Sequence, residues 1–135
     1  MALNAPVQTG PAETDPPGID PMVPRRYRVM RAWKELSDVT TMEVEPLDGE
    51  AMAFAPGQFN MLYAFGVGEV AISISGDAED SGKLVHTIRN VGAVSGALAS
   101  VSDGDTIGVR GPFGTAWPVA QETGRHIVFV AGGLG

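Results

Sequence analysis

Short runs in which apolar and polar residues alternate recur along most of the chain. In Thr41-Met42-Glu43-Val44-Glu45, the methionine and the valine fall on one side and the acids on the other. Alternation with a period of two is typical of an antiparallel strand with one buried face. Similar β-prone runs predict strands over residues 25–34, 39–46, 58–65, 70–75, 83–91 and 106–110.

One stretch departs from this alternation and has helical spacing instead. Residues 93–101 are mostly small, and Val94, Ala97, Leu98 and Val101 occupy positions i, i+3, i+4 and i+7. That spacing places the four side chains on one face of a helix, directed toward a core. The sequence therefore predicts one short helix between the fifth and sixth strands.

Turn sequences separate the predicted elements. Glycine accounts for 18 of the 135 residues, close to twice the usual share of about 7%. Pro56-Gly57, Asp80-Ser81-Gly82 and Ser102-Asp103-Gly104-Asp105 are all turn sequences. Several short antiparallel strands with such spacing indicate an all-β barrel, closed or nearly closed.

The two ends of the chain differ from the barrel sequence. Residues 1–24 are rich in proline and acids with few large apolar groups, which predicts a flexible tail. At the other end, a β-branched run over residues 126–130 leads into Gly132-Gly133-Leu134-Gly135. A strand entering such a glycine cluster normally precedes a helix whose N-terminus holds a phosphate. We therefore expect a barrel over residues 25–120, and over residues 121–135 the first strand of a truncated α/β nucleotide-binding domain.

Composition disfavours several functions. The chain has no cysteine, and its only two histidines, His86 and His126, are far apart, so no metal site is expected. The net charge is −7, and no basic residue lies between Lys34 and Lys83, a span that holds ten acids. Nucleic-acid binding needs the opposite charge. The acidic span is either a solvated surface or a docking face for a basic partner.

No targeting or membrane segment is recognisable. The sequence shows neither the basic start and apolar run of a signal peptide nor an apolar segment long enough to span a bilayer. A cytoplasmic location is therefore expected.

Two places on the predicted barrel could carry chemistry. On the strand over residues 70–75, Ile72 and Ile74 fall on one face, and Ser73 and Ser75 on the other. This hydroxyl face is either the wet side of the barrel, or Ser73 offers a donor and acceptor to a bound ring that packs against Ile72.

The second place runs from Arg89 to Ser95, where a strand ends and the predicted helix opens after Gly92. Exposed amides and the helix dipole favour an anion there, and Arg89 adds a full positive charge. An ordinary serine-assisted helix start beside a solvent-exposed arginine accounts for the same residues.

Two further features lie after the last predicted strand. The sequence Gly111-Pro112-Phe113-Gly114 indicates a rigid turn, which is either purely structural or holds Phe113 against a neighbouring domain or ligand. Trp117 is expected to serve in packing or in anchoring a linker.

The order of these motifs is more informative than any one of them. Pro56-Gly57-Gln58-Phe59 is followed by Ile72-Ser73-Ile74, then Val91-Gly92 before the helix, then Gly111-Pro112-Phe113-Gly114, then a strand with Gly-Gly-x-Gly. The set resembles the ferredoxin reductase superfamily, in which an FAD-binding barrel precedes a nicotinamide-binding α/β domain. Residues 56–63 and 66–69 look most like gamma subunits of nickel–iron hydrogenases and sulfhydrogenases. Electron-transfer subunits of dihydroorotate dehydrogenase and one of the subunits of anaerobic sulfite reductase are similar. The resemblance covers residues 23–135.

The resemblance implies a six-stranded antiparallel Greek-key barrel with one short capping helix. In the superfamily an Arg-x-Tyr-Ser motif grips the flavin, and the matching positions hold Val70, Ile72 and Ser73, so only the serine is kept. Ser73 would then bond near the reactive flavin nitrogen, with the ring packed against Ile72. The diphosphate would lie at Arg89 and the helix start. The implied FAD-binding residues are Ile72, Ser73, Arg89, Gly92, Ala93, Val94 and Ser95, and Gly132, Gly133 and Gly135 would belong to the nicotinamide site.

The resemblance also implies a function. The chain would be the FAD-binding domain of an electron-transfer subunit that passes electrons between NAD(P)H and an iron–sulfur or hydrogenase-type partner subunit. FAD is the expected cofactor, NAD(P) would bind only in the longer protein, and any iron–sulfur cluster would lie in a missing C-terminal part. The alternative is a degenerate barrel that serves as a non-catalytic docking or scaffold module.

Overall fold

The computed structural model describes residues 20–80 and 82–134 and contains six strands and one α-helix. All six predicted strands and the helix between the fifth and sixth are confirmed. The elements are β1 (Arg25–Leu36), β2 (Val39–Pro46), β3 (Phe59–Ala64), β4 (Gly68–Ser73), β5 (Leu84–Arg89), α1 (Ala93–Leu98), β6 (Thr106–Phe113) and a 3₁₀ turn, η1 (Val119–Glu122).

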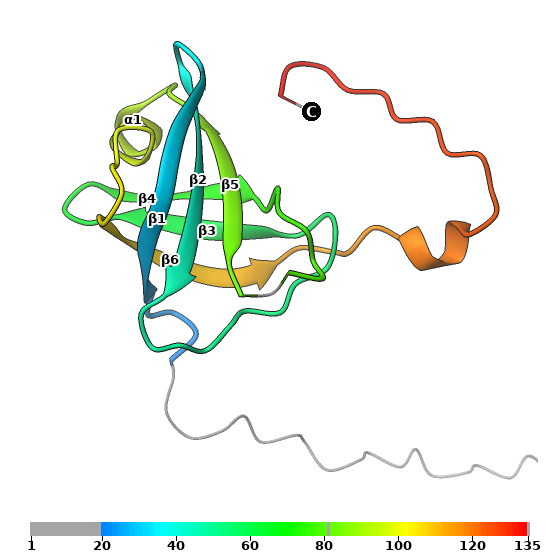
Figure 1. Ribbon diagram of the computed structural model, residues 1–135, viewed down its shortest axis with the longest axis horizontal. Coiled ribbons are helices and arrows are strands. Elements are labelled where there is room, and N and C mark those ends of the chain that lie inside the picture. The colour runs from blue at the N-terminus through cyan, green and yellow to red at the C-terminus, as the bar shows by residue number, and fades with distance from the viewer. Residues whose placement is uncertain (1–19, 81, 135) are drawn as a thin grey trace, which may run out of the picture.

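The strands form one antiparallel sheet in the order β4-β3-β6-β1-β2-β5 (Figure 1). The edge strands β4 and β5 contact each other but do not form a ladder, so the sheet is not closed. Just beyond the end of β4, the Ser75 amide donates to the Val85 carbonyl at 2.8 Å. We call the gap between β4 and β5 the seam.

The inside of the curved sheet is filled by apolar side chains that alternate with outward-facing ones. Met42 and Val44 of β2 are fully buried, as their alternation predicted, whereas Glu45 is exposed. On β5, Leu84, His86 and Ile88 point inward, and Val85, Thr87 and Arg89 point outward. The outward face of β5 at the seam thereby carries Thr87 and Arg89 beside Val85.

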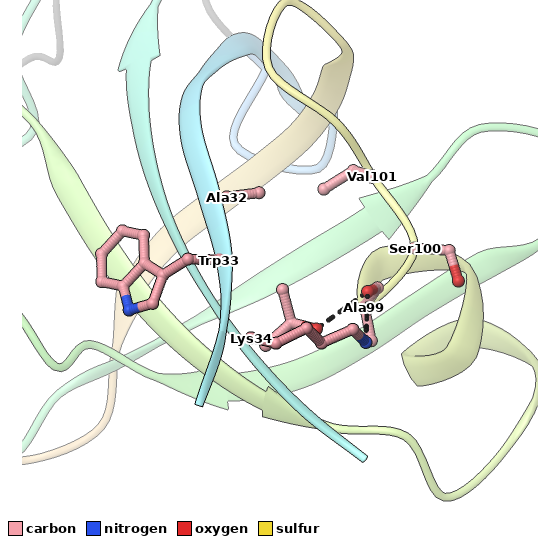
Figure 2. A pocket seen from close by; sticks show the side chains of 7 residues that line it. Ala32, Trp33, Lys34, Ala99, Ser100 and Val101 are labelled. Carbon is pink, nitrogen blue, oxygen red and sulfur yellow. Dashed lines mark hydrogen bonds between the residues drawn. The ribbon is translucent and has the colours of Figure 1, made fainter. Parts of the chain in front are cut away.

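The helix α1 packs against β3, β4 and β5 and is shorter than the predicted 93–101. Its last turn tightens, because the amides of Ser100 and Val101 donate to the carbonyls three residues before them. The Ala99 carbonyl at this end accepts hydrogen bonds from Lys34 Nζ at 3.4 Å and Thr40 Oγ1 at 2.9 Å (Figure 2). These bonds hold the C-terminal end of α1 against β1 and β2. They thereby also fix the position of its N-terminal end.

After β6 the chain leaves the barrel through η1 and continues as an irregular segment (Figure 1). The strand predicted over residues 126–130 is absent, so that prediction is wrong for the described part of the chain. Val128 and Val130 are 84% and 94% exposed, because a β-branched run forms a strand only against a partner strand, and none lies beside it here. The assignment of residues 121–135 to a nucleotide-binding domain stays a prediction.

The described residues contain neither a membrane-spanning helix nor a cluster of metal-binding side chains. Over residues 20–80 and 82–134, no helix is long and apolar enough to cross a membrane. Within the same ranges, no group of three histidine, cysteine or acidic side chains is placed to hold a metal ion. The predicted tail lies outside the described residues except for residues 20–24.

Candidate functional site

A cavity of about 540 Å³ opens on the outer face of the barrel at the seam. Its walls include Ser73 at the end of β4, Ser75 just beyond it, Thr87 from β5, Gln58 from the turn before β3, and Trp117. The volume lies in the range of about 300–1,000 Å³ that is usual for small-molecule sites. The wall combines hydroxyl groups with one aromatic face, which suits a flat ring with polar edges.

Ser73 lies in this cavity as predicted, but Ile72 does not. Ser73 is exposed and points outward, whereas Ile72 is half-buried and packs against the core. Successive strand residues point to opposite faces, so one flat ligand cannot contact both side chains from outside. Ile74, which follows Ser73, is the isoleucine that lines the cavity. The prediction that a ring packs on Ile72 therefore finds no support in the geometry.

The backbone of the cavity wall is held from three sides. The Ile74 amide donates to the Gln58 carbonyl at 3.1 Å, and the Ser75 amide donates to the Val85 carbonyl at 2.8 Å. The Ser73 carbonyl accepts a hydrogen bond from Nδ1 of His86 at 2.9 Å. The wall is thus fixed although no regular ladder closes the seam.

His86 is completely buried inside the barrel. Burial lowers the pKa of its imidazole to about 4, and the hydrogen bond to the Ser73 carbonyl opposes this shift only in part. The ring is therefore neutral near pH 7. Since a carbonyl only accepts, Nδ1 carries the proton, and the bare Nε2 faces the amide nitrogen of Asn60 at 3.3 Å.

Two other residues shape the cavity. Thr87 shares a hydrogen bond of 2.8 Å with Thr41 on the neighbouring strand. The Trp117 amide donates to the Pro56 carbonyl at 2.8 Å, and its indole lies against Gly57. The predicted anchoring role of Trp117 is thus confirmed by its contacts.

The residues predicted to meet a diphosphate follow Thr87 along the chain. Arg89 lies two residues further on, hence on the same face, with its Nε 3.3 Å from an oxygen of Asp38. The Ser95 hydroxyl accepts from the amides of Val91 and Gly92, both at 3.0 Å, so it is bonded within its own turn. That matches the serine-assisted helix start that the sequence left open.

The next three amides belong to the first turn of α1. The amides of Ala93, Val94 and Ser95 have no hydrogen-bond acceptor in the described part of the chain, as is usual for the first turn of a helix. They remain available to an anion. Gly132 and Gly133 lie in the irregular segment after η1, and Gly135 lies outside the described residues. Gly132 and Gly133 do not line the cavity, but Leu134, which follows Gly133, lines it together with Ser73.

Four residues of this site were not predicted from the sequence: Gln58, Asn60, His86 and Thr87. His86 could have been found from its position in the strand. It alternates with the apolar Leu84 and Ile88, so all three side chains point to the same, buried face. The contact with Ser73 joins two strands that are not sheet neighbours, and nothing in the sequence indicated it.

Two known proteins are similar to this chain in sequence. The chain is 34% identical over 128 residues to the sulfhydrogenase 1 gamma subunit of Pyrococcus furiosus, which covers 93% of this chain and 44% of that protein. It is 34% identical over 104 residues to a probable dihydroorotate dehydrogenase B electron-transfer subunit of Methanocella arvoryzae, covering 76% of this chain and 37% of that protein. The chain is homologous to these two subunits. It spans less than half the length of either one.

The fold agrees with this relationship. The flavohaemoglobin-like FAD/NAD-binding domain of nitric oxide dioxygenase from Vibrio cholerae superposes with a TM-score of 0.61 at 23% identity, covering 69% of this chain and 45% of that one. The barrel therefore shares the fold of the barrel in that domain. No family model matches the chain.

Proposed function

We propose that this chain is the FAD-binding module of an electron-transfer oxidoreductase subunit, with the flavin ring in the seam cavity and the diphosphate near Arg89 and α1. The observation that carries the proposal is the cavity itself. A hydroxyl-lined hollow with a rigid backbone wall occupies the outer face of a ferredoxin reductase-like barrel. It lies on the same strand face as the only arginine of β5.

The residues present fit the ring end of FAD. The Ser73 hydroxyl makes no hydrogen bond to any described residue and faces the cavity, so it is free to bond a ring heteroatom. Thr87 presents a second hydroxyl, and Trp117 offers an aromatic face. Ser73 would bind and orient the ring, since no acid–base constellation of side chains surrounds it.

The residues present also fit a diphosphate. Thr87 and Arg89 are two positions apart on one strand face, about 6.6 Å along the strand, and α1 begins a few residues later. Three unpaired amides and one guanidinium would meet the charge. The pair of Arg89 and Asp38 has side chains 41% and 51% exposed, and surface pairs of this kind contribute at most about 1 kcal/mol. Arg89 can therefore exchange its partner at low cost.

The relatives of this chain suggest which partners to propose for the module. FAD supplies the exchange between a two-electron nicotinamide donor and one-electron acceptors. We propose NAD(P)H as the donor, bound by a domain after the barrel, and an iron–sulfur or hydrogenase-type subunit as the acceptor. The support is homology to a sulfhydrogenase gamma subunit and to a dihydroorotate dehydrogenase B electron-transfer subunit. The cytoplasmic location expected from the sequence stays a prediction.

The experiment is a titration of the purified chain with FAD. Flavin absorbance that remains after desalting, and FAD fluorescence quenched by Trp117, support the proposal. A protein that stays colourless and does not change the fluorescence of added FAD contradicts it. That result favours the scaffold alternative. The observation that supports this alternative is that aliphatic Val70 and Ile72 stand where the superfamily motif has arginine and tyrosine.

A further inference from the structure

A buried polar network crosses the barrel interior behind the cavity wall. His86 of β5 and Asn60 of β3 are both fully buried, and these strands are not neighbours in the sheet. The network therefore spans the core from one side to the other. It ends at the Ser73 carbonyl, directly behind the residue whose hydroxyl faces the cavity.

The imidazole of His86 replaces a backbone hydrogen bond that the Ser73 carbonyl would accept in a closed barrel. In a closed barrel the Ser73 carbonyl at the end of β4 would accept from an amide of β5. The seam is open, and the acceptor is satisfied instead by Nδ1–H of His86 at 2.9 Å. The side chain of His86, inside the barrel, thus fixes the backbone of Ser73, whose own side chain faces the cavity on the outside.

Asn60 selects the form of histidine that can make this bond. Its amide nitrogen lies 3.3 Å from Nε2 and only donates, so Nε2 must be bare and Nδ1 must carry the proton. The position of Asn60 is itself restricted by Gly111, where a Cβ would overlap the Asn60 Oδ1.

Stability alone does not favour this arrangement. Asn60 Oδ1 is buried without a hydrogen-bond partner among the described residues, and a buried acceptor of that kind is destabilising. Aliphatic side chains of similar size would remove the unpaired Asn60 oxygen but would leave the Ser73 carbonyl without its donor. The network is better explained by what it does to Ser73 than by its contribution to folding.

We infer that His86 is a positioning residue for flavin binding: through its hydrogen bond to the Ser73 carbonyl it sets the position of the cavity wall and the direction of the Ser73 hydroxyl. This inference rests on the proposed function, because it assigns the Ser73 hydroxyl to the ring of FAD. Asn60 acts in turn by keeping the imidazole in the required tautomer.

The test uses three substitutions that separate the hydrogen bond from packing. In His86→Asn the amide nitrogen is the same number of bonds from the backbone as Nδ1, so the bond to Ser73 can be kept. In His86→Gln the amide oxygen can take the place of Nε2 and accept from the Asn60 amide, so the contact with Asn60 can be kept and the bond to Ser73 is lost. His86→Leu keeps only apolar volume. All three are compared in thermal stability, FAD affinity and the absorbance spectrum of bound FAD.

Loss of one orienting hydrogen bond should raise the dissociation constant for FAD about tenfold in His86→Gln and His86→Leu. His86→Asn should stay within about threefold of the unsubstituted chain and keep its flavin spectrum. If affinity instead follows thermal stability across the three variants, or if all three bind FAD as the unsubstituted chain does, His86 acts by packing and the inference is wrong. The proposed function stands in either case.

A second measurement needs neither a variant nor FAD. Imidazole nitrogen resonances of the unsubstituted chain should show a protonated Nδ1 and a bare Nε2, and the amides of Ile74 and Ser75 should exchange slowly with solvent. An Nε2-protonated ring, or fast exchange at both amides, overturns the inference even where FAD binds. If the chain binds no FAD at all, the proposed function fails and the inference about flavin binding fails with it. The resonance and exchange data then report whether His86 still orders the wall.

Discussion

The indole ring of Trp117 lies directly against the backbone of Gly57, where a Cβ would come within 2.5 Å of its Cδ1. Gly57 also has a φ of +95°, which favours glycine. The turn sequence before β3 and the tryptophan after β6 are therefore matched to each other, and together they form one wall of the cavity. This contact can be tested apart from the backbone strain.

Gly57→Ala should displace the indole, whereas Gly49→Ala should not. Gly49 has a φ of +78°, and a Cβ added there would meet no atom within 4 Å, so its substitution introduces strain alone. Both variants should lose about 1 kcal/mol of unfolding free energy, measured by urea denaturation. Only Gly57→Ala should also shift Trp117 fluorescence to longer wavelength, in a Trp33→Phe background, and weaken FAD binding several-fold. Equal fluorescence and affinity in the two variants would show that the contact is unimportant.

Much of the fold was predictable from the sequence, because it depends on local patterns. Alternation in β2 predicted the buried Met42 and Val44, and apolar spacing of period 3.6 predicted α1. The same reasoning failed for residues 126–130, where a β-branched run has no partner strand beside it. Local sequence reports the tendency to form a strand, but pairing decides whether the strand forms.

The site was less predictable than the fold, because its geometry depends on contacts between distant strands. Ser73 was found from its hydroxyl-bearing strand face, and that face is indeed the outer one. The support behind it was not found. His86 reaches Ser73 across an open seam, and the register of β5 against β4 cannot be read from either strand alone. Ile72 does not line the cavity, because its alternation with Ser73 directs it toward the core, so its contact with the ring stays a prediction.

Ser73→Ala should weaken FAD binding with little effect on folding. The hydroxyl makes no bond to any described residue and the side chain is exposed, so the unfolding free energy should change by less than about 0.5 kcal/mol. Loss of one hydrogen bond to the ring should raise the dissociation constant by about five- to tenfold. Fluorescence titration measures the affinity, and Ser102→Ala on an exposed turn is the control. If both variants bind FAD with the same affinity, the ring does not lie against Ser73.

Arg89→Ala should weaken FAD binding by about tenfold or more, since it removes a charge-assisted bond to phosphate. Asp38→Asn removes the competing carboxylate 3.3 Å from the Arg89 guanidinium, so it should leave affinity unchanged or raise it. The measurement is FAD affinity at two salt concentrations, and the salt dependence should be smaller in Arg89→Ala. Arg125→Ala, whose side chain is 71% exposed, is the control for loss of one positive charge. Equal losses in Arg89→Ala and Arg125→Ala would remove Arg89 from the phosphate site.

His86 should make folding stability depend on pH in the mildly acidic range. Burial lowers its pKa from 6.5 to about 4 in the folded chain, so between these values the unfolded chain binds the proton and the folded chain does not. The unfolding free energy is then constant above about pH 6.5 and falls as the pH drops toward 4, by about 3 kcal/mol in all. Urea denaturation at steps between pH 7.5 and 5 measures this slope above the range in which most carboxylates titrate.

His86→Asn is the control for this pH dependence, because its amide can make the same bond to Ser73 without titrating. The variant should have a flat stability profile between pH 7.5 and 5. If the unsubstituted chain is equally stable at pH 7.5 and 5, the imidazole is not held neutral in the fold. The Nδ1–H bond to the Ser73 carbonyl would survive protonation, but the bare Nε2 facing the Asn60 amide would not. Acid should therefore loosen the Asn60 side of the network first.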